Sequence, residues 1–226
     1  MIDVYEADRR LEVLGPWEFV REFAEYWSRP LVDGDGYSDS ELDAAEERLG
    51  FALPVAFRRA YQLFGRRDDL TSNHDRLRPP GELEVDERGE ALVFRDENQG
   101  AATWGVLLED LAAEDPPVYM KPDLAMREQE RWEGWQGRFS QVCVEIVLAE
   151  SVHDMKLADE RDQVEEDAAI LERDFSRMPL QGEARWFAGP DVILRDDGLD
   201  WLSVRARTEE ALERVRHRMP GDWING

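Results

Sequence analysis

The chain lacks the features that mark disulfide-bonded, secreted and membrane-spanning proteins. Its 226 residues include one cysteine, Cys143, which excludes an internal disulfide and favours a reducing compartment. The N-terminal residues carry charges every few positions in place of a basic start followed by an apolar run, so they predict no signal peptide. No uninterrupted apolar run reaches the roughly 18 residues that cross a bilayer. We therefore expect a cytoplasmic protein that does not enter a membrane.

Sequence signatures of common enzymes are also missing. We find no Gly-x-Ser-x-Gly, no phosphate-binding P-loop and no Gly-x-Gly-x-x-Gly after a strand. The histidines His74, His153 and His217 lie far apart, and none has a second His or Cys at metal-ligand spacing. His74, beside Asp75, has an alternative interpretation as a catalytic base, but a solvated loop residue is the simpler one. We predict no enzymatic activity, no cofactor and no metal site.

Basic residues are scarce relative to acidic ones. The chain has 52 Asp and Glu against 28 Lys and Arg, which gives a net charge of −24. Such a surface repels nucleic acid and anionic lipid and attracts basic proteins. No basic patch interleaved with aromatic residues occurs, so we expect no direct binding of nucleic acid. Solubility or adaptation to salt remains an alternative explanation of the charge.

The N-terminal half predicts three helices with clear start and stop signals. Pro16 to Ser28 carries an apolar stripe at helical spacing behind a proline that suits the first turn. Ser38 and Glu41 have the spacing of a capping box, and Gly50 suits the left-handed residue that ends a helix. Pro54 to Gly65 predicts the next helix. The length of the chain favours one elaborated domain.

The remaining residues predict a polar loop over residues 66–81, followed by strands and three further helices. Short strands are expected at Leu83–Val85, Ala91–Arg95, Thr103–Leu107 and Val118–Met120. A helix with Cys143 as a small core residue is expected from Phe139. Residues 150–178 predict an acidic surface helix, and the C-terminal part reads strand, strand, helix, with Thr208 as the helix cap.

The segment SELDAAEERLGFALPVAFRRAYQLFG resembles the first helices of the SUKH superfamily, which includes bacterial immunity proteins and the yeast Smi/Knr cell-wall regulators. The residues that match the family pattern are Glu46, Leu49, Gly50, Leu53, Pro54, Tyr61 and Gly65. Three further blocks follow in the family's order. LVFRDENQGAATWGV is similar to a strand, an ENQ turn and a Trp-Gly strand, and contains Asn98 and Trp104. DPPVYM, with Pro116 and Pro117, resembles the next strand, and Trp132 with FSQVCVEIVL resembles the closing aromatic and helix.

The four blocks cover roughly residues 38–150. The resemblance implies an α+β fold with a single twisted, mainly antiparallel sheet and helices packed around it. It implies one domain over residues 1–226, with a helical and strand-strand-helix extension over 151–226. It also implies a non-enzymatic immunity protein that binds a cognate toxin, a nuclease or nucleic-acid deaminase, and neutralises it by occlusion. A regulatory or scaffolding module like the yeast proteins is the alternative, and the oligomeric state is not predicted.

The polar centre of FRDENQGAATWGV has two interpretations. In the structural one, Asn98 and Gln99 satisfy backbone groups where two strands join, while Trp104 packs beneath them. In the functional one, Glu97 and Gln99 point into a concave face and contact the toxin. Partner-binding residues are therefore expected at Asp96, Glu97, Gln99 and Asp115, which flank the family-like blocks.

Overall fold

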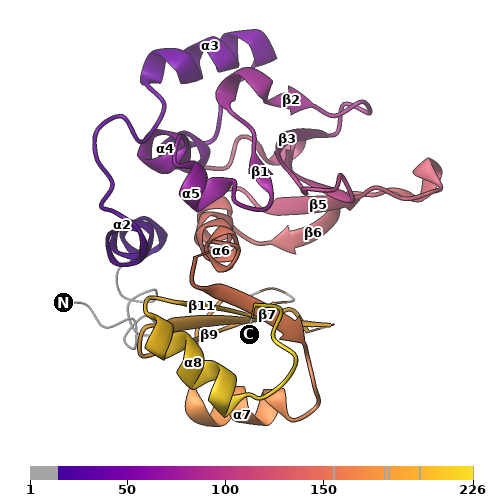
Figure 1. The fold of residues 1–226 in the computed structure, drawn as a ribbon. Coiled ribbons are helices and arrows are strands. Elements are labelled where there is room, and N and C mark those ends of the chain that lie inside the picture. The colour runs from indigo at the N-terminus through magenta and orange to yellow at the C-terminus, as the bar shows by residue number, and fades with distance from the viewer. Residues whose placement is uncertain (1–14, 155, 181, 183, 199, 226) are drawn as a thin grey trace. The chain divides into compact units, whose positions relative to one another are not determined.

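The computed structural model describes residues 15–225 except 155, 181, 183 and 199, and shows an α+β protein (Figure 1). The chain forms two compact units. We call Pro30–Val147 the central unit, and Met1–Arg29 together with Leu148–Gly226 the terminal unit. The family-like segment predicted over roughly 38–150 falls almost wholly in the central unit. The prediction of one domain is not tested by this division alone.

The predicted α+β class is confirmed, but the prediction of a single sheet is wrong. The strands form a six-stranded sheet in the central unit and a five-stranded sheet in the terminal unit. Every strand pair in both sheets is antiparallel. The reason for the second sheet is that the acidic segment and the C-terminal strands pair with one another and not with the first sheet.

The central unit combines short helices with the six-stranded sheet. Its helices and 3-10 turns are α3 (Asp39–Leu49), α4 (Val55–Phe64), α5 (Asp68–Thr71), η2 (Pro80–Glu82), η3 (Leu108–Asp110) and η4 (Arg127–Gln129). Its strands are β1 (Arg76–Leu77), β2 (Glu84–Val85), β3 (Ala91–Asp96), β4 (Ala102–Leu107), β5 (Val118–Pro122) and β6 (Glu133–Gln136). The sheet order is β1-β3-β4-β5-β6, and β2 also pairs with β3. Helix α6 (Phe139–Val152) begins in this unit and ends in the terminal one.

Local signals at the first two helices of this unit are confirmed. Ser38 and Glu41 form both bonds of the predicted capping box at the start of α3. Gly50 ends α3 with φ of 82°, a conformation that glycine adopts without a Cβ penalty. Glu46 then joins the two helices, because its carboxylate accepts hydrogen bonds from Leu53 N–H at 2.7 Å and from the Arg58 guanidinium at 2.8 Å.

An aromatic cluster forms the core between α4, α6 and the sheet. The rings of Phe57 and Phe139 stack at 4.6 Å, and both meet the edge of Phe94 from β3. Tyr61, one turn after Phe57, is buried and donates its hydroxyl to Arg78 O at 2.7 Å. Cys143 is buried in α6, and burial raises the pKa of its thiol well above the ordinary value. The prediction of a core cysteine is confirmed.

One prediction for the central unit is wrong in detail. The segment 66–81, expected as loop, contains α5, β1 and part of η2, because β1 pairs with the end of β3. The residues around Trp135 form β6, an edge strand that pairs only with β5 and carries no alternating apolar pattern of its own. Glu87–Gly89 lies in the turn that joins the paired strands β2 and β3, with Gly89 at φ of 71°.

The terminal unit packs helices on the five-stranded sheet. Its helices are α2 (Pro16–Trp27), α7 (Asp167–Asp174), α8 (Glu209–Arg218) and the end of α6. Its strands are β7 (Ala158–Asp162), β8 (Ser176–Arg177), β9 (Arg185–Gly189), β10 (Val192–Asp196) and β11 (Trp201–Ala206), in the order β7-β11-β10-β9-β8. The predicted helix from Pro16 and the Thr208 cap of α8 are confirmed. The C-terminal part has three strands before its helix.

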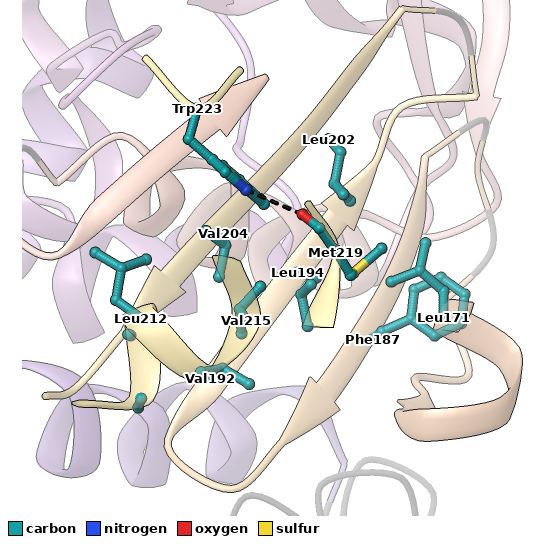
Figure 2. Packing of buried hydrophobic residues seen from close by; sticks show 12 residues of the cluster. Leu171, Phe187, Val192, Leu194, Leu202, Val204, Leu212, Val215, Met219 and Trp223 are labelled. Atoms are coloured by element: carbon teal, nitrogen blue, oxygen red, sulfur yellow. Dashed lines mark hydrogen bonds between the residues drawn. The ribbon is translucent and has the colours of Figure 1, made fainter. Parts of the chain in front are cut away.

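Successive side chains of β11 point to opposite faces of the sheet, and both faces are packed against other residues. Leu202 and Val204 pack with α8, where Val215 lies, in the apolar cluster drawn in Figure 2. Arg205 points away from that cluster and places its guanidinium over the ring of Trp27 from α2 at 5.4 Å. Both faces of the strand are therefore covered, which explains why its residues are buried almost without a break.

The acidic segment 150–178 is not the continuous surface helix that was predicted. Among its described residues, the end of α6 and α7 are helical, and Val164, which precedes α7, is 45% exposed. The preceding β7 pairs with β11 instead. Asp167 is almost fully buried, and its carboxylate forms a two-bond ion pair with the buried guanidinium of Arg161. Within the described residues no helix combines the length and apolar character needed to cross a membrane.

Candidate functional site

The turn between β3 and β4 is held by a carboxylate. Glu97 Oε2 accepts hydrogen bonds from Gln99 N–H at 2.8 Å and Ala101 N–H at 2.9 Å, and Gly100 turns the chain at φ of 77°. The prediction that the carboxamides of Asn98 and Gln99 satisfy these backbone groups is wrong. Glu97 is the first residue of the turn, and one oxygen of its carboxylate accepts both hydrogen bonds. Glu97 therefore has the structural role that was predicted for the carboxamides.

Asn98 and Gln99 do different things in the turn. The backbone N–H of Asn98 donates to Asp75 Oδ1 at 3.2 Å, and its side-chain Nδ2 lies 3.1 Å from His74 Nδ1. Asn98 therefore ties the turn to the loop after α5. The side chain of Gln99 is exposed and makes no hydrogen bond among the described residues. Of Asn98 and Gln99, therefore, it is Gln99 whose side chain is available to contact a partner.

Trp104 lies in the core, as predicted. It is 9% exposed, its ring is 5.6 Å from that of Trp135, and the guanidinium of Arg95 lies 4.9 Å from its centroid. Arg95 is itself 2% exposed and pairs with Asp75 at 3.0 Å. This arrangement neutralises a buried charge and covers the indole, so the strand after the turn is fixed by packing.

The glycine after Trp104 makes room for a second tryptophan. A Cβ on Gly105 would lie 2.9 Å from Trp132 Cη2 and 3.0 Å from Leu92 O. The indole of Trp132 donates to Asp86 Oδ2 at 3.2 Å, and Lys121 lies over its ring. Gly105 of the Trp-Gly pattern and Trp132 thus pack against each other. In the sequence, only the resemblance to the family links them.

The other predicted partner-binding carboxylates have internal bonds. Asp96 accepts two hydrogen bonds of 2.7 Å from the guanidinium of Arg78. Asp115 accepts from Ser140 N–H at 2.8 Å and from Ser140 Oγ at 2.6 Å, at the first turn of α6. Pro116, directly after it, accepts from Phe139 N–H. The structure gives these residues bonds that the fold uses, and their contact with a partner stays a prediction.

A polar cavity of about 270 Å³ lies over β3, β4 and β5. Val93 and Thr103 contribute to its lining together with charged residues of both signs. The cations in its lining include Arg78, Lys121 and Arg127, which pair with Asp96, Asp86 and Glu87. The lining holds four basic and five acidic side chains, so its charges nearly balance and give a ligand of either sign little attraction.

An unpaired acidic surface lies instead on the connection between β4 and β5. We call residues 108–114, LEDLAAE, the acidic loop; it contains three carboxylates and no basic residue. Glu109 and Glu114 are exposed, and their side chains form no hydrogen bond or ion pair among the described residues. Asp110 accepts from the hydroxyl of Tyr119 at 3.1 Å. Sequence reasoning missed this loop because it concentrated on family-like blocks, although the run without a basic residue was visible.

Exposed apolar atoms lie next to these carboxylates. The backbone N–H of Ala56 donates to Glu114 O at 2.8 Å, which joins the start of α4 to the acidic loop. Val55, the first residue of α4, is 62% exposed, and Ala112 and Ala113 are exposed as well. Apolar groups with charges around them are typical of surfaces that bind other proteins.

One cluster of possible metal ligands occurs among the described residues. One ligand atom each of His74, Asp75 and Glu97 lies within 4.8 Å of the other two. The sequence did not reveal this set, because the two segments are brought together only when β1 pairs with β3. The predicted absence of a metal site was argued from the spacing of His and Cys alone, which cannot detect carboxylate ligands from a distant turn.

No model of a known protein family matches the chain, and neither a characterised protein nor a solved structure matches it. The resemblance of residues 38–150 to the SUKH superfamily therefore stays a prediction.

Proposed function

We propose that the chain is a cytoplasmic immunity protein that neutralises a basic toxin effector, a nuclease or nucleic-acid deaminase, by covering its substrate groove. The observation that carries the proposal is the acidic loop, where Glu109 and Glu114 are exposed and unpaired beside exposed Val55. Other carboxylates of the central unit, such as Asp96 and Asp115, are bonded within the fold. In the acidic loop, by contrast, negative charge is free to act on another molecule.

Charge complementarity explains why the partner should be a protein that acts on nucleic acid. Such an enzyme needs a basic groove to hold a polyanion, and an acidic surface fits that groove. Free carboxylates steer the encounter, while the small apolar patch at Val55, Ala112 and Ala113 can exclude water once the two surfaces meet. The family-like blocks of the sequence support the same conclusion.

Coexpression tests this function directly. The chain and the effector domain encoded beside it should purify as one complex, and the complex should have lost the effector's activity on its nucleic-acid substrate. An effector that stays active at saturating chain would contradict the proposal. A complex that leaves the effector active would favour the regulatory or scaffolding alternative.

A further inference from the structure

The loop after α5 and the turn between β3 and β4 bring an imidazole and two carboxylates to one place. His74 and Asp75 come from the loop, and Glu97 comes from the turn. All three residues lie in the central unit, so the cluster belongs to one compact body. Imidazole nitrogen with carboxylate oxygen is a donor set that suits zinc and similar divalent ions, whereas magnesium and calcium prefer oxygen alone.

We propose that His74, Asp75 and Glu97 bind a divalent ion of the zinc type, with Asn98 as the fourth ligand. The ion would join the His74 loop to the turn that Glu97 holds. This inference does not depend on the proposed function, because it concerns different residues from the acidic loop.

Both carboxylates are oriented by groups behind them. Glu97 uses Oε2 for the two backbone N–H groups of the turn, which leaves Oε1 without a hydrogen bond among the described residues. Asp75 accepts from Arg95 at 3.0 Å and from Asn98 N–H at 3.2 Å. Hydrogen bonds of this kind fix metal ligands in place before the ion arrives and raise its affinity.

Asn98 has the position of a further ligand. Its Nδ2 lies 3.1 Å from His74 Nδ1 and 3.3 Å from His74 Nε2. A half-turn of the carboxamide exchanges nitrogen for oxygen at the same place, and this oxygen can bind a metal. Two ligands of a tetrahedral zinc ion lie roughly 3.4 Å apart when each is about 2.0–2.1 Å from the ion. The spacing of Asn98 and His74 fits that geometry.

The ligand atoms of His74, Asp75 and Glu97 reach the same geometry when the exposed His74 side chain rotates and the two hydrogen-bonded carboxylates make small adjustments. Their separations, within 4.8 Å, must shorten toward the same roughly 3.4 Å. His74 and Asn98 are exposed, so their side chains have room to move. The charges also favour a cation, since the cluster holds two carboxylates and the guanidinium of Arg95 pairs with one of them, Asp75.

Equilibrium dialysis with elemental analysis tests the site on the full chain, purified without a histidine tag and freed of metal by a chelator. One Zn²⁺ per chain is expected, and His74→Ala should weaken binding by about tenfold or more. Glu97→Gln should also weaken binding, yet its retained oxygen still accepts the two N–H groups, so the metal-free protein should melt close to the parent. His217→Ala, which removes an exposed imidazole from α8, is the matched control and should bind like the parent.

Thermal melting gives a second measurement. Because a ligand that binds only the native state stabilises it, Zn²⁺ should raise the Tm of the parent and of His217→Ala more than that of His74→Ala. The proposal is wrong if the parent binds no stoichiometric zinc, or if His74→Ala keeps the parent's affinity. It is equally wrong if Mg²⁺ or Ca²⁺ binds as tightly as Zn²⁺, because the imidazole would then contribute nothing.

Discussion

Two groups of carboxylates in the central unit look alike in the sequence and differ in their bonding. Asp96, Glu97 and Asp115 each accept hydrogen bonds from a guanidinium, a hydroxyl or backbone N–H groups of the fold. The side-chain carboxylates of Glu109 and Glu114, in the acidic loop, accept none among the described residues. The difference teaches that the net charge of −24 does not locate a binding surface. Only the carboxylates that the fold does not use are free for a partner.

The largest expected loss of stability comes from the core packing of Trp104, in the strand that follows the turn held by Glu97. Trp104→Ala should lower the free energy of unfolding by roughly 3–5 kcal/mol, because the indole is buried between Arg95 and Trp135. Denaturant unfolding measures the change. Trp201→Ala, at a tryptophan that is 41% exposed, is the control and should cost much less. Equal losses would contradict the burial of Trp104.

Glu114 and Asp115 are adjacent in the chain but belong to the two different groups of carboxylates. Asp115→Ala should cost about 1–2 kcal/mol, because it removes the carboxylate that accepts from Ser140 at the first turn of α6. Glu114→Ala should stay within about 0.5 kcal/mol of the parent. Thermal and denaturant melts of both variants compare them, and an unchanged Asp115→Ala would show that the cap does not stabilise α6.

The turn between β3 and β4 offers a second matched pair. Glu97→Ala should cost about 1 kcal/mol, because two backbone N–H groups lose their acceptor. Gln99→Ala should leave stability within about 0.5 kcal/mol of the parent, since its exposed side chain holds nothing. If Gln99→Ala proved the more damaging substitution in denaturant unfolding, the carboxamide interpretation of this turn would be restored.

Acid should weaken the bonded carboxylates selectively. Burial alone raises the pKa of Asp86, but the hydrogen bonds from Glu90 N–H, Lys121 and Trp132 outweigh it and lower that pKa. A lowered pKa in the folded state means stability that is fully present above the unfolded value, about 3.9, and is lost as pH falls below that value and through the lower, folded one. The Tm gap between the parent and Asp86→Asn should therefore be widest near neutral pH and narrow below about pH 4. A constant gap would contradict the shift, and Glu90→Gln should follow the parent throughout.

Signals that depend on neighbouring residues were predictable from the sequence. The capping box of Ser38 and Glu41, the left-handed Gly50 and the Thr208 cap are set by the side chains within one turn of a helix. The α+β class was implied by the resemblance of residues 38–150, and the structure confirms that class. The core positions of Trp104 and Cys143 also followed, because each lies in an apolar run of its own element.

Features that depend on distant pairing were not predictable. Strands β6 and β7 have four and five residues, and their pairing with β5 and β11 decides that they are strands. The division into two sheets has the same cause. The role of Glu97 depends on where the turn places two N–H groups, and the cluster with His74 depends on β1. Composition and periodicity contain no signal for these contacts.

The association rate with the neighbouring effector domain tests the central claim most directly. Glu90→Gln with Glu109→Gln and Glu114→Gln neutralises exposed carboxylates on and beside the acidic loop, which bonds to Glu90 through Leu108 N–H. Asp162→Asn with Glu165→Gln and Glu166→Gln is the matched control in the terminal unit, where all three are exposed. Asp167 is left intact, because its buried ion pair supports the fold.

Stopped-flow mixing at several salt concentrations supplies the measurement. Exposed charges act over a Debye length of about 10 Å at 0.1 M salt, so steering weakens as salt rises. The parent's on-rate should fall several-fold between low and high salt, and the acidic-loop variant should show that loss already at low salt, with a smaller change in off-rate. The control should behave like the parent. Equal on-rates for the parent and the acidic-loop variant, at every salt concentration, would contradict the account.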